Sequence, residues 1–175
     1  MPICQLATAA SEEEYVYGAC EPGWDHNAST IEGWIQFIQD YNIKRVCCLL
    51  SSRQVAAHDE LIGQYQDAFG TESVLHAPVT DHMLIPESMF TNEIIPFLEK
   101  SAAADEKVVV HCKAGIGRTG QALAGWLVHA HDYSPNDAIE TVSNRHRTPD
   151  DAVRAGQATT SDLIDRLGSL ATKNG

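Results

Sequence analysis

The chain has 175 residues, of which 43% are hydrophobic and 21% are charged, and its formal net charge is −12. This length suits a single domain over residues 1–175 with one substantial core, and residues 1–13 are expected to form a tail or an edge segment. The negative charge argues against non-specific binding to nucleic acid or to an anionic membrane, but it allows basic partners. No apolar run reaches the roughly 18 residues of a membrane helix, so we expect no membrane insertion. The five cysteines lack metal-finger spacing, and we expect a cytoplasmic protein with reduced thiols.

The first half of the chain alternates between strand-like and helix-like segments. The box Ser29-Thr30-Ile31-Glu32 predicts a helix start, with Ser29 as its cap. Trp24, Asp25 and His26 form a loop that either lines a substrate mouth or packs over the edge of the core. We predict strands over residues 14–20, 43–50 and 73–79, and helices over residues 31–42 and 54–69.

The second half continues this alternation. A helix is expected over residues 87–104, and Pro96 should kink or split it. The strand-like run Lys107–Val110 then precedes three further helices, predicted over residues 121–131, 136–147 and 156–170. Strands that alternate with helices indicate an α/β domain, with a central, mostly parallel sheet and helices on both faces.

The stretch from His111 to Gly120, His-Cys-Lys-Ala-Gly-Ile-Gly-Arg-Thr-Gly, lies between a strand and a helix. A helix start offers unpaired backbone N–H groups and partial positive charge, which together suit a phosphate-sized anion. Arg118 can grip two phosphate oxygens with its planar guanidinium. The same positive field stabilises a thiolate at Cys112, which would then be a nucleophile. A glycine-rich turn with a buried, inert cysteine is the alternative.

This stretch resembles the signature His-Cys-x5-Arg-Ser/Thr-Gly of the cysteine-dependent protein tyrosine phosphatase superfamily, and it matches every fixed position. The resemblance implies a protein tyrosine phosphatase-like fold, with no metal and no cofactor. It makes Cys112 the nucleophile, Thr119 the support for the leaving thiolate, and His111 a residue that orients the loop. The backbone amides of the phosphate loop would bind the substrate phosphate together with the Arg118 side chain, and the loop comprises Lys113, Ala114, Gly115, Ile116, Gly117 and Arg118.

Asp81 follows a predicted strand, and loops at the carboxyl ends of parallel strands gather at one sheet edge. A carboxylic acid there can protonate the leaving oxygen and later accept a proton from water. The dual-specificity phosphatases, which this chain resembles, also have an Asp in a loop upstream of the signature. We therefore predict Asp81 as the general acid and base. The alternative is an ordinary turn Asp, and the neighbouring His82 is a weaker candidate for the acid.

The segment from Asn144 to Pro149 is basic, and it is predicted either as a solvated helix end or as a rim that attracts phosphate. The order Arg147, Pro149, Val153 and Gln157 resembles the dual-specificity group, which suggests that Gln157 positions the hydrolytic water. Cys47 and Cys48 are expected in the core. One of them could form a protective disulfide with Cys112 upon oxidation, as in some relatives.

The predicted function is hydrolysis of phosphomonoesters through a phosphocysteine intermediate, with a phosphorylated and possibly basic protein or peptide as substrate. Within the superfamily, the loop resembles both the proline-directed mitotic-exit phosphatases and a phosphoinositide 3-phosphatase. The latter carries a second lysine where this chain has Ile116, and the acidic chain also disfavours a highly charged inositide. The alternatives are a lipid, sugar or RNA phosphatase with the same loop, or a non-catalytic phosphate-binding module. The sequence leaves the oligomeric state open.

Overall fold

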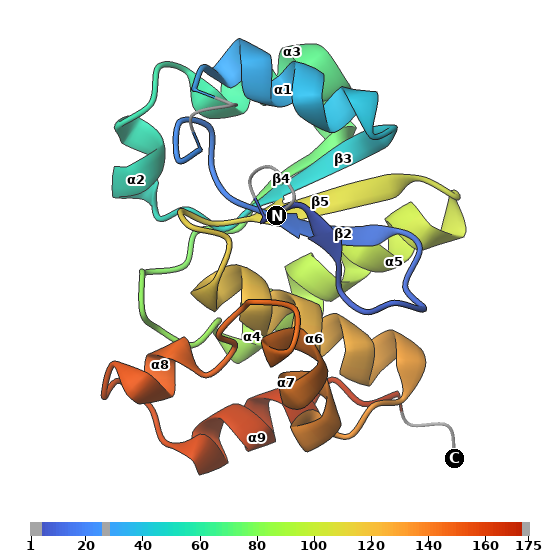
Figure 1. Cartoon of the computed structure of the whole chain (residues 1–175), viewed down its shortest axis with the longest axis vertical. Helices are drawn as coiled ribbons and strands as arrows, with labels where there is room; N and C mark the ends of the chain where they lie inside the picture. The colour runs from blue at the N-terminus through green and yellow to red at the C-terminus, as the bar shows by residue number, and fades with distance from the viewer. Residues whose placement is uncertain (1–4, 26–28, 173–175) are drawn as a thin grey trace.

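The computed structural model describes residues 5–25 and 29–172 (Figure 1). It contains a five-stranded sheet with the order β1-β2-β5-β3-β4. Only the pairing of β1 with β2 is antiparallel, as expected for a mostly parallel sheet. The strands are β1 (Ala7–Thr8), β2 (Val16–Ala19), β3 (Ile43–Cys48), β4 (Val74–His76) and β5 (Lys107–His111).

Helices cover both faces of the sheet, which confirms the predicted α/β class (Figure 1). One layer contains α1 (Ile31–Asp40) and α3 (Leu61–Phe69), and α2 (Ser52–Ala56) lies beside the carboxyl ends of the strands. The opposite face carries α4 (Glu87–Met89), α5 (Ile95–Ala103), α6 (Gly117–His131), α7 (Pro135–Ser143), α8 (Asp151–Arg154) and α9 (Thr160–Gly168). No helix in residues 5–25 and 29–172 is long and apolar enough to cross a membrane.

The sheet separates two hydrophobic clusters because side chains alternate along each strand. Val108 and Val110 of β5 belong to the cluster under α6, whereas Val109 belongs to the cluster under α1 and α3. Both faces of the sheet are therefore buried at residues 46–48 of β3 and 108–110 of β5, which explains why these two stretches are apolar throughout. Cys47 and Cys48 lie in the core as predicted, one in each cluster.

Several predicted helix boundaries were wrong because local caps and turns overrode the apolar pattern. The cap of α1 is Thr30, not Ser29, and its side chain accepts a hydrogen bond from Gly33 N. The helix predicted over residues 54–69 is two helices, since Glu60 between them has left-handed backbone (φ 49°). The helix predicted from Gly156 begins at Thr160, because Gly156 has φ +78° and Thr159 caps α9.

The helical segment over residues 87–103 departs from a regular α-helix just before Pro96, but it stays helical throughout and is not split. Proline has no N–H to donate, so a regular helix would lose a hydrogen bond at this position. A π-helical segment, Phe90–Ile94, precedes α5, and the N–H of Ile95 donates to the carbonyl of Phe90. Pro96 thereby falls in the first turn of α5, where no donor is needed.

Candidate active site

The phosphate loop, residues 112–118, connects central strand β5 to helix α6 at the carboxyl edge of the parallel strands. Cys112 is 3% exposed and lies at the start of this turn. Gly115 has φ +76°, and a Cβ there would lie 2.6 Å from the carbonyl carbon of Ala19. Only glycine fits this position, because any other side chain would meet both backbone strain and a backbone atom of the neighbouring segment. The tight turn lets the loop curl as the glycine pattern predicted.

Arg147 supports the phosphate loop from behind. Arg147 is 4% exposed, and its guanidinium donates to the carbonyls of Gly115, Gly18 (3.0 Å) and Gln5 (2.6 Å). Burial lowers the pKa of Arg147 to about 10, which still leaves it charged at neutral pH. Both interpretations of the basic segment, a solvated helix end and a phosphate-attracting rim, are therefore wrong for Arg147. The sequence pattern could not reveal this contact, because its partners lie far away along the chain.

His111 contacts the loop through the backbone, which is the position predicted for it. Its Nδ1 lies 2.9 Å from the carbonyl oxygen of Cys112, and its Nε2 lies 3.0 Å from the hydroxyl of Tyr65. Burial lowers the pKa of His111 to about 4, so the ring is neutral at physiological pH. A neutral ring satisfies both contacts if Nδ1–H donates to Cys112 and Nε2 accepts from Tyr65. The ring also packs against Trp34, with the centroids 5.1 Å apart.

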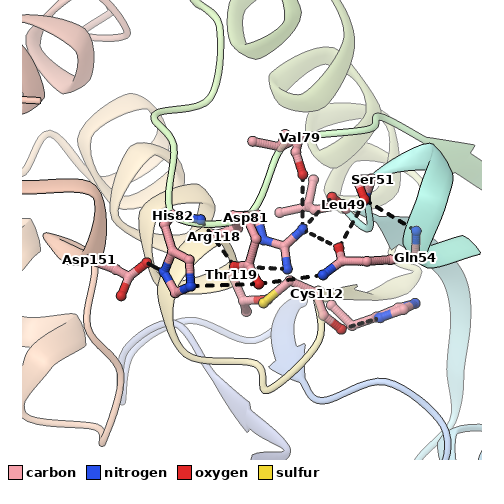
Figure 2. A network of polar contacts seen from close by, with 11 residues as sticks. Leu49, Ser51, Gln54, Val79, Asp81, His82, Cys112, Arg118, Thr119 and Asp151 are labelled. Atoms are coloured by element: carbon pink, nitrogen blue, oxygen red, sulfur yellow. Dashed lines mark hydrogen bonds and ion pairs between the residues drawn. The ribbon is translucent and has the colours of Figure 1, made fainter. Parts of the chain in front are cut away.

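Two side chains of α6 face the reacting end of the loop (Figure 2). The hydroxyl of Thr119 lies 3.1 Å from Cys112 Sγ, close enough to donate a hydrogen bond to a thiolate. Arg118 is 3% exposed, and its Nη1 donates to the Val79 carbonyl (2.9 Å) and to Gln54 Oε1 (2.7 Å). Within the described residues, Arg118 Nε is buried and has no hydrogen-bond partner. A buried donor without a partner costs about 1–3 kcal/mol, which an acceptor from a bound anion would relieve.

Gln54 is a site residue that the sequence analysis missed. It occupies the third position of α2, where it forms a reciprocal capping box with Ser51. Its Oε1 accepts from the Arg118 guanidinium, and its Nε2 lies 3.4 Å from Asp81 Oδ2. The pattern Ser51-x-x-Gln54 was a visible signal for a helix start. It gave no sign that the same glutamine would orient the arginine.

Asp81 lies in the acid loop, which comprises residues 80–86 and comes after strand β4 in the chain. Asp81 Oδ1 is 3.2 Å from Arg118 Nη2, so the acid loop and the phosphate loop share one site, as the topology predicted (Figure 2). The Asp81 side chain is 41% exposed, in contrast to the buried arginine. The following residue, His82, has Nδ1 2.9 Å from Asp151 Oδ2.

Among the described residues, one group combines three potential metal ligands. The ligand atoms of Asp81, His82 and Asp151 lie within 4.8 Å of one another. Asp81 is already paired with the positive charge of Arg118, which opposes a cation at this position. We assign no ion to this group.

Gln157, which is predicted to position the hydrolytic water, lies beside the acid loop. Its side chain is exposed and lines a pocket of about 520 Å³ next to Met83 and Leu84 of the acid loop. Within the described residues, no hydrogen bond connects its side chain to Cys112, Asp81 or Arg118. Its role in positioning water stays a prediction.

The cysteines that the structure describes divide into free thiols and a disulfide-bonded residue. Cys47, Cys48 and Cys112 are free thiols, and the disulfide between Cys112 and Cys47 or Cys48 stays a prediction. Burial raises the pKa of Cys48 to about 12 and raises that of Cys47 as well, so neither is ionised at neutral pH. Cys20, in contrast, is disulfide-bonded, so the expectation that every thiol is reduced is wrong for this residue.

The aromatic loop before α1 remains open to solvent. Trp24 is 53% exposed. The interpretation in which it packs over the edge of the core is therefore wrong. The N–H of Trp24 donates to the Glu21 carbonyl, and the N–H of Glu21 donates to the Lys113 carbonyl in the phosphate loop. Trp24 thus belongs to a segment that adjoins the phosphate loop. His26 lies outside the described residues.

A thiol at the centre of an anion-binding turn, an arginine beside it and a carboxylate opposite define the site of a cysteine-dependent phosphatase. The family model described as "Polymorphic toxin system, DSP-PTPase phosphatase" matches residues 18–132. The chain belongs to this family, whose match includes both Asp81 and the complete phosphate loop.

Similar proteins of known sequence are phosphatases with different named substrates. The chain is 30% identical over 113 residues to the dual specificity protein phosphatase Mpk3 of Drosophila melanogaster, a match that covers 65% of this chain and 25% of Mpk3. It is 32% identical over 69 residues to phosphatidylglycerophosphatase and protein-tyrosine phosphatase 1 of Mus musculus, which covers 39% of this chain and 36% of that protein. The chain therefore spans only about a quarter to a third of these relatives.

Solved structures share the fold over almost the whole chain. The crystal structure of PTPMT1 in complex with PI(5)P has a TM-score of 0.72 at 17% identity and covers 95% of this chain and 96% of its own. Tk-PTP in its active form has a TM-score of 0.70 at 18% identity, with 95% of each chain covered. These likenesses confirm a protein tyrosine phosphatase-like fold.

Proposed function

We propose that this chain hydrolyses phosphomonoesters of proteins, acting on phosphorylated tyrosine, serine or threonine through a phosphocysteine intermediate. The observation that carries the proposal is the Arg118 guanidinium, which pairs with Asp81 at 3.2 Å beside the thiol of Cys112. Nucleophile, phosphate ligand and acid therefore lie within one site. A non-catalytic phosphate-binding module would have no need for the thiol and the carboxylate together.

In the first step, the thiolate of Cys112 attacks phosphorus, and an S–P bond forms as the bond to the leaving oxygen breaks. Asp81, in its protonated form, transfers its proton to that oxygen. The backbone amides of the phosphate loop and the buried Nε of Arg118 bind the equatorial oxygens. These donors are held in place before substrate arrives, so little reorganisation is needed as charge develops.

In the second step, water attacks the phosphocysteine, and Asp81, now ionised, accepts the proton of that water. The S–P bond breaks, and inorganic phosphate leaves with the site restored. The developing thiolate at Cys112 receives a hydrogen bond from Thr119, whose hydroxyl is 3.1 Å away. His111 stays neutral throughout and orients the loop through the Cys112 carbonyl rather than acting as a base.

A protein substrate is favoured by the charge and by the border of the site. The net charge of −12 and the apolar Ile116 disfavour a highly anionic ligand. Two exposed apolar side chains border the site: Trp24 belongs to a segment that adjoins the phosphate loop, and Met83 belongs to the acid loop. Such side chains suit contact with a peptide.

A lipid phosphatase is the second candidate. The similar mouse protein is named a phosphatidylglycerophosphatase as well as a protein-tyrosine phosphatase. PTPMT1, which shares the fold, is described in complex with PI(5)P. A phosphomonoester on a lipid would react with the same three groups, so the choice depends on contacts outside the phosphate loop.

The test compares kcat/KM for phosphotyrosine and phosphothreonine peptides, phosphoinositides, phosphatidylglycerophosphate, sugar phosphates and RNA 5′-phosphates. Wild type should hydrolyse peptides best, whereas Cys112→Ser should lose activity on every substrate. A higher kcat/KM for a lipid, sugar or RNA ester would refute the protein substrate, and activity in Cys112→Ser would refute the mechanism.

Trp24→Ala provides a sharper test of peptide binding. We expect kcat/KM for peptides to fall several-fold, because the substitution removes about 1 kcal/mol of apolar contact. The kcat/KM for p-nitrophenyl phosphate should be unaffected. Tyr41→Ala is the matched control, because Tyr41 is also about half exposed but lies at the far end of α1. Equal effects of the two substitutions on peptide hydrolysis would contradict the proposed contact.

A further inference from the structure

The tip of the acid loop has contacts on both sides. Asp81 contacts Arg118 on one side, and His82 contacts Asp151 on the other, with Nδ1 2.9 Å from the carboxylate (Figure 2). The base of the loop is held separately, by the Ile85 N–H donating to Gln121 Oε1 at 2.7 Å. The tip and the base are therefore secured by different groups.

His82 is joined to Asp81 as well as to Asp151. Its backbone N–H lies 3.1 Å from Asp81 Oδ1, and its Nε2 lies 3.9 Å from Asp81 Oδ2. The backbone of His82 is left-handed, with φ +64°, and this conformation directs the ring towards Asp151 while the N–H remains on Asp81. A displacement of His82 would therefore displace the carboxylate of Asp81.

Asp151 is fixed with respect to the phosphate loop. Its N–H donates to the Thr148 carbonyl at 3.0 Å, and the Thr148 N–H donates to the Ile116 carbonyl at 3.1 Å. A Cβ added to Gly117 would lie 2.9 Å from Asp151 Oδ2, so this carboxylate lies directly against the start of α6. The contact between His82 and Asp151 thus connects the acid loop to the rigid side of the site.

Substrate binding changes the balance of these contacts. The phosphoryl group of a substrate needs the Arg118 guanidinium, which is paired with Asp81 in the free protein. When phosphate oxygens take that positive charge, and when Asp81 is protonated to act as an acid, the attraction between Asp81 and Arg118 weakens. The contact of His82 with Asp151 does not involve the phosphate ligands, so it persists at this stage.

We propose that His82, held by Asp151, is a positioning residue that keeps Asp81 over the leaving oxygen once the substrate has occupied Arg118. This inference rests on the proposed phosphatase reaction and adds a residue to it. The imidazole itself transfers no proton to the substrate.

The ring of His82 is charged over a wider pH range than usual. The hydrogen bond with Asp151, followed by the charges of Asp81 and Asp151, raises the pKa of His82, and Arg118 opposes this. Because the pKa is raised, the charged contact is present at low pH and weakens as the pH rises through the pKa of the folded protein. The neutral ring can still donate from Nδ1, so the contact becomes weaker rather than being abolished.

The experiment uses His82→Gly and His82→Asn. Glycine keeps the left-handed backbone but removes the donor, whereas asparagine tolerates that backbone and retains an uncharged donor near the position of Nδ1. His146→Gly is the matched control, because His146 is also exposed and has φ +66°. Two substrates are compared. The leaving group of phenyl phosphate must be protonated by an acid, whereas the leaving group of p-nitrophenyl phosphate depends much less on protonation. A chelator is present throughout to remove adventitious cations.

His82→Gly should lower kcat on phenyl phosphate about tenfold, because it removes one charge-assisted hydrogen bond. The KM for this substrate should be nearly unchanged. The loss on p-nitrophenyl phosphate should be much smaller. His82→Asn should recover most of the rate and should lose the decline in kcat that His82 causes at high pH. His146→Gly should behave as wild type. Equal losses on both esters, an unaffected His82→Gly, or no recovery in His82→Asn would each refute the proposal.

Two further measurements separate this inference from the proposed function. His82→Gly and Asp151→Ala combined should cost no more than either alone, because both remove the same contact; full additivity would refute it. Without any substrate, the pKa of His82 measured by NMR should fall in Asp151→Asn, and an unchanged value would refute the contact itself. A wild type that hydrolyses neither ester refutes the proposed function, even where the NMR result supports the contact.

Discussion

The phosphate loop and the acid loop differ in how firmly the fold holds them. Cys112, Gly115 and Arg118 of the phosphate loop are buried, and the loop is supported from behind by Arg147 and from the opposite face of the sheet by His111. The tip of the acid loop is exposed, and Asp81 is held mainly by the arginine that a substrate would also need. The groups that bind the phosphate are therefore in place before a substrate arrives, whereas the position of Asp81 depends on what occupies Arg118.

Arg118→Lys should have the largest effect, because this residue is part of the phosphate loop and also contacts the acid loop through Asp81. Lysine keeps the charge but cannot make the planar set of contacts with Gln54, Val79 and Asp81 while binding phosphate. We expect kcat to fall about 100- to 1000-fold on every substrate, as for loss of an oxyanion donor. Steady-state kinetics would measure this, with circular dichroism to check the fold. A loss of less than about tenfold would mean that the charge alone is sufficient.

Asp81→Asn should have the next largest effect and should be selective. Asparagine fills the same space but has no proton to transfer, so kcat on phenyl phosphate should fall about 100-fold. The fall on p-nitrophenyl phosphate should be far smaller, since its leaving group needs little protonation. The ratio of the two rates is the measured quantity. If the ratio equals that of wild type, Asp81 is not the acid.

His111 should affect stability more than rate, with a defined dependence on pH. Its pKa is lowered from 6.5 to about 4 by burial, so between these values the unfolded chain binds a proton that the folded chain does not. Stability from the neutral ring is therefore fully present above about pH 6.5 and is lost as the pH falls towards 4, by on the order of 3 kcal/mol.

Urea unfolding of wild type and His111→Asn at several pH values would test this. The free energy of unfolding should decline less between pH 6.5 and 4 in the variant than in wild type. Parallel curves for the two proteins would show that His111 is not buried in its neutral form.

The sequence determined the reaction centre because its residues are close together along the chain. Cys112, Arg118 and Thr119 fall within one strand–loop–helix unit, so local geometry was enough to bring them together. Asp81 could be added because the carboxyl ends of parallel strands meet at one edge of the sheet, whatever the details of packing. The α/β class followed from the same alternation of strands and helices.

Only the tertiary structure decided what surrounds that centre. The contacts of Gln54 with Arg118, of Arg147 with Gly115, and of His82 with Asp151 each join residues at least 30 positions apart. No periodicity encodes such contacts, because they depend on how whole elements pack against one another. The sequence therefore established which groups react, and the packing of the elements established how each group is held.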